Sequence, residues 1–301
     1  MAGTTIIVGY DGFERSQDAL VLGRRLAGAV GARLVLADVY PEDRVASRAD
    51  AGAHGDPLRE EAERVLAGSD APDSVERRAV PAQSAARGLH VLAEHEGAVL
   101  IVIGSSRRGT PGLVESGSLS QRLIHGAPCG VAVAPVGYAE RTVLAWERIL
   151  VGYVATEEGE AALRAGVTLA EATGAALRIV TVVEPIPVAV GITPEAIEYV
   201  RAADRSALDA AAATVPSHVR VEVELLDGDP GVVLRERAAD VDLVVVGSRG
   251  YGRLRQVLLG SVSAALLHGS PAPVIVLPRG AQRQLTAHAA AFTRAAANPA
   301  P

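Results

Sequence analysis

The chain repeats itself at a separation of 143 residues, and this repeat constrains its fold more than any other feature. Residues 6–10 (IIVGY) match residues 149–153 (ILVGY). Further matches at this separation, with no gap, are Gly31 with Gly174, Gly104 with Gly247, Gly117 with Gly260, His125 with His268 and Pro128 with Pro271. Solenoid repeats are only about 20–50 residues long, so we interpret the pattern as two copies of a complete domain. We expect domains at 1–137 and 147–280, a linker at 138–146 and a flexible tail at 281–301.

Each copy alternates short runs of branched aliphatic residues with segments of helical periodicity. Strands are predicted at 6–9, 34–40, 75–80, 99–103 and 131–134, and again at 149–152, 177–183, 219–225, 243–246 and 274–277. The predicted helices include 16–30, 58–67, 89–96, 118–125 and the long helix 194–213. This alternation favours a parallel sheet covered by helices. The fold class predicted is α/β, with two tandem doubly wound five-stranded parallel sheets related by a pseudo-twofold axis.

Composition excludes several classes of protein. Hydrophobic residues make up 49% of the chain and charged residues only 21%, which excludes a disordered chain. No apolar run reaches the roughly 18 residues of a membrane span, and the N-terminus lacks the pattern of a signal peptide. We therefore expect a soluble, cytoplasmic protein with no membrane partner. A net charge of -6 gives neither half a basic face for nucleic acid.

All 29 basic residues are arginine, so every site that needs a lysine ammonium group is excluded. This removes the Walker-type phosphate loop and the pyridoxal Schiff base. The single cysteine, Cys129, cannot form an intramolecular disulfide, and we expect it to be a buried packing residue. No serine nucleophile elbow or paired-histidine zinc motif is present, so no catalytic or metal-binding residue is assigned.

The segment after the fourth predicted strand of the second copy is rich in glycine. Gly247 and Gly250 let a backbone turn approach a ligand closely, and Gly260 follows after nine further residues. We expect Ser261 to cap the next helix, whose first amides attract an anion. Because the carboxyl ends of parallel strands gather ligands at a switch point, these residues predict a triphosphate site that needs no lysine.

These motifs together resemble the universal stress proteins. The resemblance rests on Gly-x2-Gly-x9-Gly-Ser after a hydrophobic strand, on a helix ending in HGSPAPV, and on the opening residues 6–12 (IIVGYDG). It covers nearly the whole chain in two copies. It implies a strand order of 3-2-1-4-5, as in adenine nucleotide alpha hydrolase-like folds. It also implies binding of ATP, with or without Mg²⁺, or of another adenine nucleotide, and pairing of the domains through their fifth strands.

Neither copy matches the family's nucleotide motif throughout. Asp11 stands where the family has a carboxylate near the adenosine, but Arg107 replaces the second glycine of that copy. The second copy has the complete glycine motif but Val154 at the position of the acid. We rank the second copy higher, because the phosphate contacts should contribute most. The candidate nucleotide-binding residues are Gly152, Val182, Gly247, Ser248, Arg249, Gly250, Gly260, Ser261, Val262 and Ser263 in the second copy, and Gly9, Asp11, Val39, Gly104, Arg107, Gly117, Ser118 and Ser120 in the first.

Simpler roles stay open for several of these residues. Asp11 could only close a turn before the first helix, whereas Arg107 could lie on the phosphates of a ligand. Ser118 and Ser261 are expected to cap helices with or without a ligand. His125 and His268 are each expected at a helix C-terminus, where histidine favours the helix dipole.

Two alternatives to a nucleotide-binding stress regulator follow from the split motifs. One is an interaction or scaffold protein that binds no nucleotide, and the other is a slow ATP hydrolase. The fifth strands, 131–134 and 274–277, are uncharged and prone to aggregate as free edges, so we expect them to pair with each other. Two such internally paired chains could form a homodimer.

Overall fold

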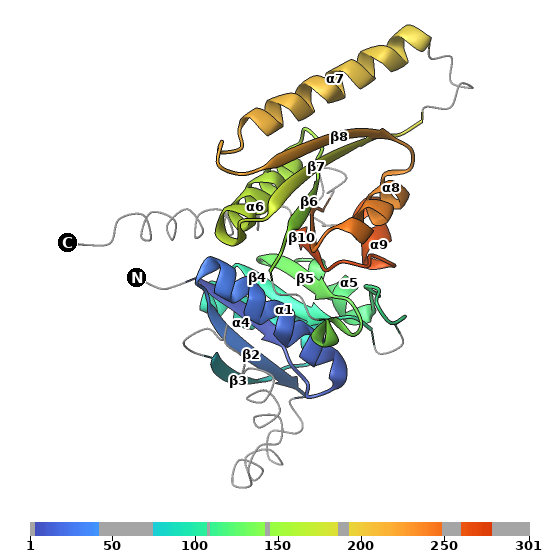
Figure 1. Ribbon diagram of the computed structural model, residues 1–301. Coiled ribbons are helices and arrows are strands. Elements are labelled where there is room, and N and C mark those ends of the chain that lie inside the picture. The colour runs from blue at the N-terminus through green and yellow to red at the C-terminus, as the bar shows by residue number, and fades with distance from the viewer. Residues whose placement is uncertain are drawn as a thin grey trace, which may run out of the picture.

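The computed structural model describes residues 4–41, 75–106, 109–141, 145–185, 193–248 and 260–278. Within these residues the strands form one ten-stranded sheet in the order β3-β2-β1-β4-β5-β10-β9-β6-β7-β8 (Figure 1). Neighbouring strands are parallel except β5 and β10, which are antiparallel. The strands are β1 (Thr5–Gly9), β2 (Arg33–Tyr40), β3 (Val75–Pro81), β4 (Leu100–Gly104), β5 (Gly130–Ala134), β6 (Arg148–Gly152), β7 (Ala176–Val183), β8 (Val221–Asp227), β9 (Leu243–Gly247) and β10 (Val274–Leu277).

Helices cover both faces of the sheet. The described helices are α1 (Glu14–Val30), α4 (Ala85–Glu96), α5 (Ser118–Ile124), α6 (Glu157–Thr173), α7 (Pro194–Ala213), α8 (Pro230–Arg237) and α9 (Ser261–Leu267), with short turns η2 (Tyr138–Glu140) and η4 (Ala238–Asp240). Side chains of α1, α6 and α7 pack in one core cluster, and those of α4, α5, α8 and α9 pack in the other. Each half is therefore a parallel sheet between two helical layers, which confirms the predicted α/β fold class.

Local sequence signals account for the helix ends. Gly31 and Gly174, which match in the repeat, end α1 and α6 with φ angles of 63° and 75°. Only glycine adopts this left-handed conformation readily. At the other end of a helix, the Thr193 side chain accepts a hydrogen bond from the Ala196 N–H, and Pro194 begins α7. Helix α7 therefore has the predicted bounds.

The repeat is not free of gaps, and this part of the prediction is wrong. Leu34 of β2 pairs with Val75, whereas its counterpart Leu177 pairs with Val221, a separation of 146 residues instead of 143. The separation returns to 143 at β4 and β9, because Ile6 pairs with Leu100 and Ile149 with Leu243. Strands β3 and β8 have a neighbour on one side only, so their register in the repeat is less constrained. The predicted helix 58–67 and the tail 281–301 lie outside the described residues.

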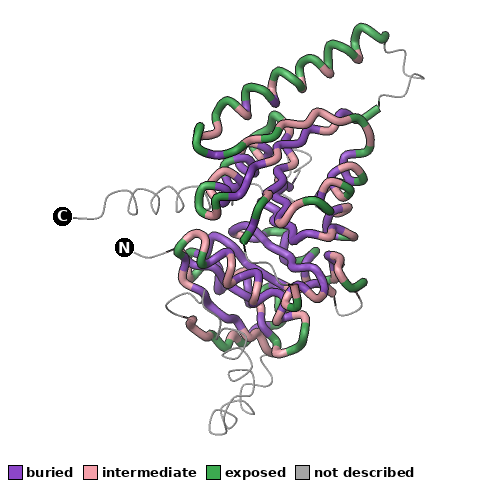
Figure 2. The backbone as a smooth tube through the Cα atoms, in the orientation of Figure 1, coloured by how far each residue is buried: buried purple, intermediate pink, exposed green. Residues whose placement is uncertain are grey.

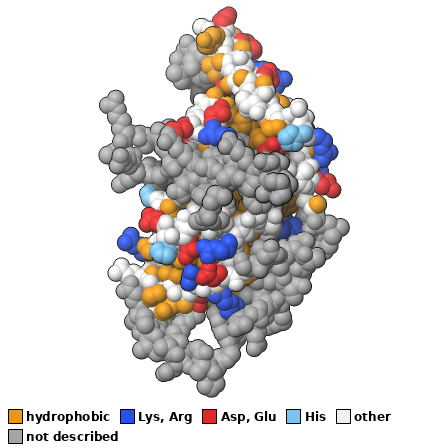
Figure 3. All heavy atoms as spheres, turned by 90° about the vertical axis from the view of Figure 1, so that its left-hand side faces the viewer, with side chains coloured by type: hydrophobic (Ala, Val, Ile, Leu, Met, Phe, Trp, Pro, Cys, Tyr) orange, Lys and Arg blue, Asp and Glu red, His pale blue; other side chains and the backbone are white. Residues whose placement is uncertain are grey.

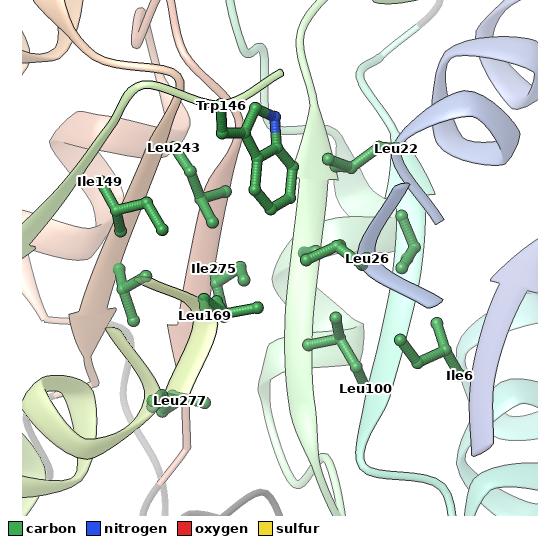
Figure 4. Packing of buried hydrophobic residues seen from close by; sticks show 14 of the residues in the cluster. Ile6, Leu22, Leu26, Leu100, Trp146, Ile149, Leu169, Leu243, Ile275 and Leu277 are labelled. Carbon is green, nitrogen blue, oxygen red and sulfur yellow. The ribbon is translucent and has the colours of Figure 1, made fainter. Parts of the chain in front are cut away.

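The two halves share a continuous core on each face of the sheet. One cluster contains Leu22 and Leu26 of α1 together with Leu169 of α6, so it crosses from the first half to the second. The buried backbone in Figure 2 accordingly runs through both halves. Trp146 is 7% exposed, and Figure 4 shows its ring between Leu243 and Leu22.

The segment after β5 is held by a buried carboxylate from α1. Asp18 accepts hydrogen bonds from the backbone N–H groups of Gly137 (3.0 Å) and Ala139 (2.8 Å). Burial raises the pKa of Asp18, although these two bonds oppose the shift. These hydrogen bonds fix residues 137–139, which connect the first half to the second, against α1.

The described surface in Figure 3 carries acidic and basic side chains next to each other. Ion pairs also occur in the first half, where Arg33 is paired with the carboxylates of Glu76 and Glu96. Such mixing gives this face no field of a single sign. Among the described helices, none has the length and apolar character that crossing a membrane requires.

We expect the shared core to make both halves unfold together. Ile275 of β10 is 1% exposed and lies opposite Ala132 of β5, so Ile275→Ala should lower the free energy of unfolding by about 2–5 kcal/mol. Fluorescence of Trp146, the only tryptophan, and far-UV circular dichroism should report one coincident transition. Tyr199→Ala, at a side chain that is 77% exposed, is the control and should change stability by less than about 0.5 kcal/mol. Two separate transitions would contradict a shared core.

Cys129 should not react in the native protein. Its thiol is buried, and burial raises the pKa of Cys129 to about 12. At pH 8 only about one thiol in ten thousand is then ionised, and the thiolate is the reactive form. A chromogenic disulfide reagent should therefore label Cys129 only after denaturation. Labelling of the folded protein within seconds would show that the thiol is accessible.

Candidate functional site

A pocket that is open to solvent lies in the second half at the carboxyl ends of β6, β7 and β9. Strand order reverses between β6 and β9, because the chain continues from β6 to β7 on one side and returns to β9 on the other. Doubly wound sheets bind ligands at such a point. The pocket lining consists of Gly152, Tyr153, Val154, Thr156, Glu158, Gly159, Val180, Val182, Pro230, Leu234, Val246, Gly247, Gly260, Val262 and Ser263.

Aliphatic side chains form much of the pocket wall. Val180 and Val182 are two residues apart in β7 and therefore point to the same face of the sheet. Leu234 of α8 and Val246 of β9 complete the wall. A lining of this kind, with a few polar groups, is typical of sites for small organic ligands.

Glycine at the end of β9 allows α6 to approach the sheet closely. A Cβ atom on Gly247 would lie 2.8 Å from the carbonyl oxygen of Glu158, closer than real contacts allow. The first half has the same arrangement, because a Cβ on Gly104 would lie 2.0 Å from the carbonyl oxygen of Arg15. These glycines therefore have a packing role in both halves, independent of any ligand.

Few polar side chains line the pocket. Ser263 donates a hydrogen bond from its hydroxyl to the Gly247 carbonyl (3.2 Å), and Thr156 accepts one from the Gly159 N–H (3.2 Å). Glu158 is the acidic residue of the lining, and no arginine of the described residues contributes to it. An anionic ligand group in this part of the pocket would therefore depend on backbone N–H donors.

Tyr153 fixes the segment that follows β6. Its backbone N–H donates to the Val180 carbonyl (2.8 Å), and its hydroxyl donates to Glu160 (2.5 Å). Burial and the neighbouring Glu160 carboxylate raise the pKa of Tyr153 to about 12. The hydroxyl therefore stays protonated at neutral pH and keeps this hydrogen bond.

Six of the sequence-predicted residues line the pocket: Gly152, Val182, Gly247, Gly260, Val262 and Ser263. Ser248 does not, because its side chain is fully buried and its backbone N–H donates to the Leu277 carbonyl (2.9 Å). Its hydroxyl has no hydrogen-bond partner among the described residues, whereas Ser105 in the first half donates to the Ala134 carbonyl (2.7 Å). Arg249 and Gly250 lie outside the described residues, as does Arg107.

The first-half candidates are arranged differently. The Asp11 carboxylate accepts a hydrogen bond from the Phe13 N–H (3.1 Å), so it closes the turn before α1. Ser120 donates to the Gly117 carbonyl (2.9 Å), not to the end of β4 as Ser263 does to the end of β9. The two other first-half positions lie at strand ends. Gly9 adjoins Leu89 of α4, and Val39 adjoins Gly88 of the same helix.

The prediction that Ser118 and Ser261 cap their helices is wrong. Gly117 and Gly260 occupy the N-cap positions in extended conformations, with no capping bond from a side chain. The serines are the first helical residues and are exposed. The physical reason is that the cap precedes the first helical turn, and glycine is among the residues that accept this position. His125 and His268, in contrast, are at the C-caps as expected.

Nine of the fifteen lining residues were not among the candidates predicted from the sequence. Val180 could have been found, because it shares a strand face with Val182. Pro230 and Leu234 belong to α8, an element for which no bounds were predicted in the second copy. Contact between α8 and the strand ends depends on tertiary packing, which the local pattern does not specify.

Comparisons with known proteins agree with the fold and the duplication. The sequence profile of the universal stress protein family matches residues 4–135 and 145–278. Universal stress protein Rv2319c of Mycobacterium tuberculosis is 29% identical over 204 residues, which cover 65% of this chain and 70% of that protein. Rv2005c of the same species is 32% identical over 186 residues, covering 60% and 61%.

Solved structures resemble nearly the whole chain. A universal stress protein from Archaeoglobus fulgidus superposes with a TM-score of 0.66 at 19% identity, covering 93% of this chain and all of that chain. Protein PA1789 of Pseudomonas aeruginosa superposes with a TM-score of 0.65 at 17% identity, covering 97% and 98%. The fold, the duplicated profile and these relatives lead to one conclusion: the chain belongs to the universal stress protein family, with two copies of the family's domain in tandem.

Proposed function

We propose that the pocket of the second half binds an adenine nucleotide, ATP with or without Mg²⁺, and that the protein acts as a stress-response regulator with little or no turnover. The observation that carries this proposal is the position of an aliphatic pocket at the switch point of the second sheet. Ligands of doubly wound sheets bind at such a switch point, in pockets lined mainly by apolar side chains.

The lining residues suit the two ends of such a ligand. The aliphatic side chains of Val180, Val182 and Leu234 would contact the adenine ring. Gly247 and Gly260 would let the backbone approach the phosphates, together with Arg249 and Gly250 of the sequence motif. Mg²⁺ on the phosphates would lower the repulsion between their charge and Glu158.

The two halves differ in how well they suit a nucleotide. Asp11 already accepts a backbone hydrogen bond, and the first half has Arg107 where the second has a motif glycine. Val154 lines the second pocket in place of the acid, which removes a polar contact near the ribose but leaves the phosphate end intact. We therefore propose the second half as the stronger site and the first half as the weaker one.

Two observations keep the alternatives distinct. The alternative of a scaffold protein that binds no nucleotide rests on two residues. Val154 replaces the acid in the second half, and Asp11 of the first half closes a turn.

A slow hydrolase would need a base to activate water. Glu158 is the carboxylate in the described lining, and release of phosphate from bound ATP would support that alternative.

We also propose that the β5·β10 pairing is the contact between the two domains in solution, with boundaries at 137 and 147. Val133 pairs with Val274, and Val131 pairs with Val276, so each strand protects the edge of the other. A homodimer of two chains would then need a different surface. Analytical ultracentrifugation of the intact chain measures whether such a homodimer forms, because a molecular mass above 30.9 kDa requires contacts between chains.

The nucleotide proposal predicts that filling the pocket weakens ATP binding. Val182→Phe adds a ring where the adenine would lie, and we expect it to weaken ATP binding about tenfold or more, equivalent to about 1.4 kcal/mol. Isothermal titration calorimetry with ATP and Mg²⁺ measures the effect. The parent should bind ATP with a stoichiometry of at least one per chain.

Val39→Phe is the matched control, because Val39 occupies the same position in the first half. We expect it to leave the stronger site unchanged. Equal binding by the parent and by Val182→Phe would contradict the assignment of this pocket. A parent that binds no adenine nucleotide would favour the scaffold protein instead.

A further inference from the structure

A segment of the first half forms backbone hydrogen bonds with the end of α9, the helix whose beginning lines the second-half pocket. Residues 112–116 lie between β4 and α5, and they meet residues 267–271 at the C-terminal end of α9. The N–H groups of Val114 and Ser116 donate to the carbonyls of Ser270 and Leu267, each at 2.7 Å. Gly269 donates back to the Val114 carbonyl at 2.8 Å. We call these two segments, together with Arg141, the cross-half clamp.

Arg141 connects the two sides of the clamp. Its guanidinium donates one hydrogen bond to the Gly112 carbonyl and one to the Pro271 carbonyl, both at 2.8 Å. It also lies over the ring of Tyr138, 5.8 Å from the centroid. Since Asp18 holds the backbone on both sides of Tyr138, the arginine starts from a fixed position. One side chain thus bonds a loop of the first half to the turn between α9 and β10 of the second.

Side chains add a contact that the repeat does not duplicate. The Nδ1 atom of His268, the C-cap of α9, lies 3.4 Å from a carboxylate oxygen of Glu115. The residue that matches Glu115 in the second copy is Leu258, and an aliphatic side chain offers no such acceptor.

Helix α9 spans the distance between the clamp and the pocket. Gly260, Val262 and Ser263, at its beginning, line the pocket, whereas Leu267 and His268, at its end, belong to the clamp. Seven residues at 1.5 Å each make a rod of about 10 Å, which is short enough to move as a unit. If α9 moves as one rigid body, a shift of the clamp would move the pocket wall, and a shift of the wall would move the clamp.

We propose that the cross-half clamp positions α9 for ligand binding, with Arg141 as its main positioning residue, and that occupancy of the second-half pocket is transmitted through α9 to residues 112–116 of the first half. This inference rests on the proposed function. The receiving segment leads directly to Gly117, Ser118 and Ser120, the candidate residues of the weaker site. Ligand binding in one half would thus change the other without any contact between two ligands.

Arg141→Met tests the positioning role, because it keeps much of the side-chain volume and removes both bridging hydrogen bonds. With ATP and Mg²⁺ as the probe, we expect about fivefold weaker binding or more. Arg33→Met is the matched control: Arg33 is also partly buried with both guanidinium NH₂ groups bonded, but its partners, the carboxylates of Glu76 and Glu96, belong to the first half alone. It should bind ATP like the parent, whatever its melting temperature.

Hydrogen exchange provides a readout that a merely structural role would not change. In the parent, ATP should slow exchange at the amides of Val114, Ser116 and Gly269, which lie outside the pocket lining. Arg141→Met should reduce this protection, and Val182→Phe should abolish it. Arg141→Lys keeps the charge but not the planar fork, so its affinity and protection should be intermediate, which tests the clamp even if the Met variant does not fold.

The outcomes separate the two proposals. A parent that binds no ATP overturns the proposed function and the clamp with it. A parent that binds ATP normally, with unchanged exchange at 112–116 and unchanged affinity in both Arg141 variants, overturns the clamp alone.

Discussion

The antiparallel pairing of β5 with β10 is the contact on which the rest of the molecule depends. Three residue pairs, centred on Ala132 and Ile275, join two parallel sheets into one. Parallel sheets end in strands with unpaired backbone groups, and these two strands are short, aliphatic and almost completely buried. Their pairing also brings α1 and α6 together over a shared core. The duplication therefore supplies each domain with the partner that its exposed edge requires.

Much of the fold could be predicted from the sequence, because strands and glycine caps leave strong local signals. Helix α7 and strand β10 have the predicted bounds, and most other strands differ by one residue at an end. The shift of β8 by two residues shows the limit of this reasoning. An outer strand has one neighbour to fix its register, so a constant repeat need not extend to it.

The candidate site could be predicted less completely. Gly247 was singled out because a glycine lets the backbone approach a ligand closely, and it lines the pocket, as the candidate Gly152 does. Leu234 was not found, because its part in the lining depends on how α8 packs against the strand ends. Ser261 was given the wrong role, since serine is the more favoured N-cap but glycine also accepts this position, and Gly260 occupies it. Sequence motifs indicate which backbone segments approach a ligand, whereas apolar walls are set by packing.

Antiparallel pairing of two parallel sheets has a further geometric consequence. Strands of the first half run antiparallel to those of the second. The carboxyl ends of the two sets of strands therefore lie at opposite ends of the sheet, measured along the strand direction. Molecules that bind at the carboxyl ends of the two sets of strands therefore approach the protein from opposite sides. Neither can block or touch the other, and both sides can be engaged at once. An effect of one molecule on the binding of the other therefore has to be transmitted through the protein, along helices such as α5 and α9.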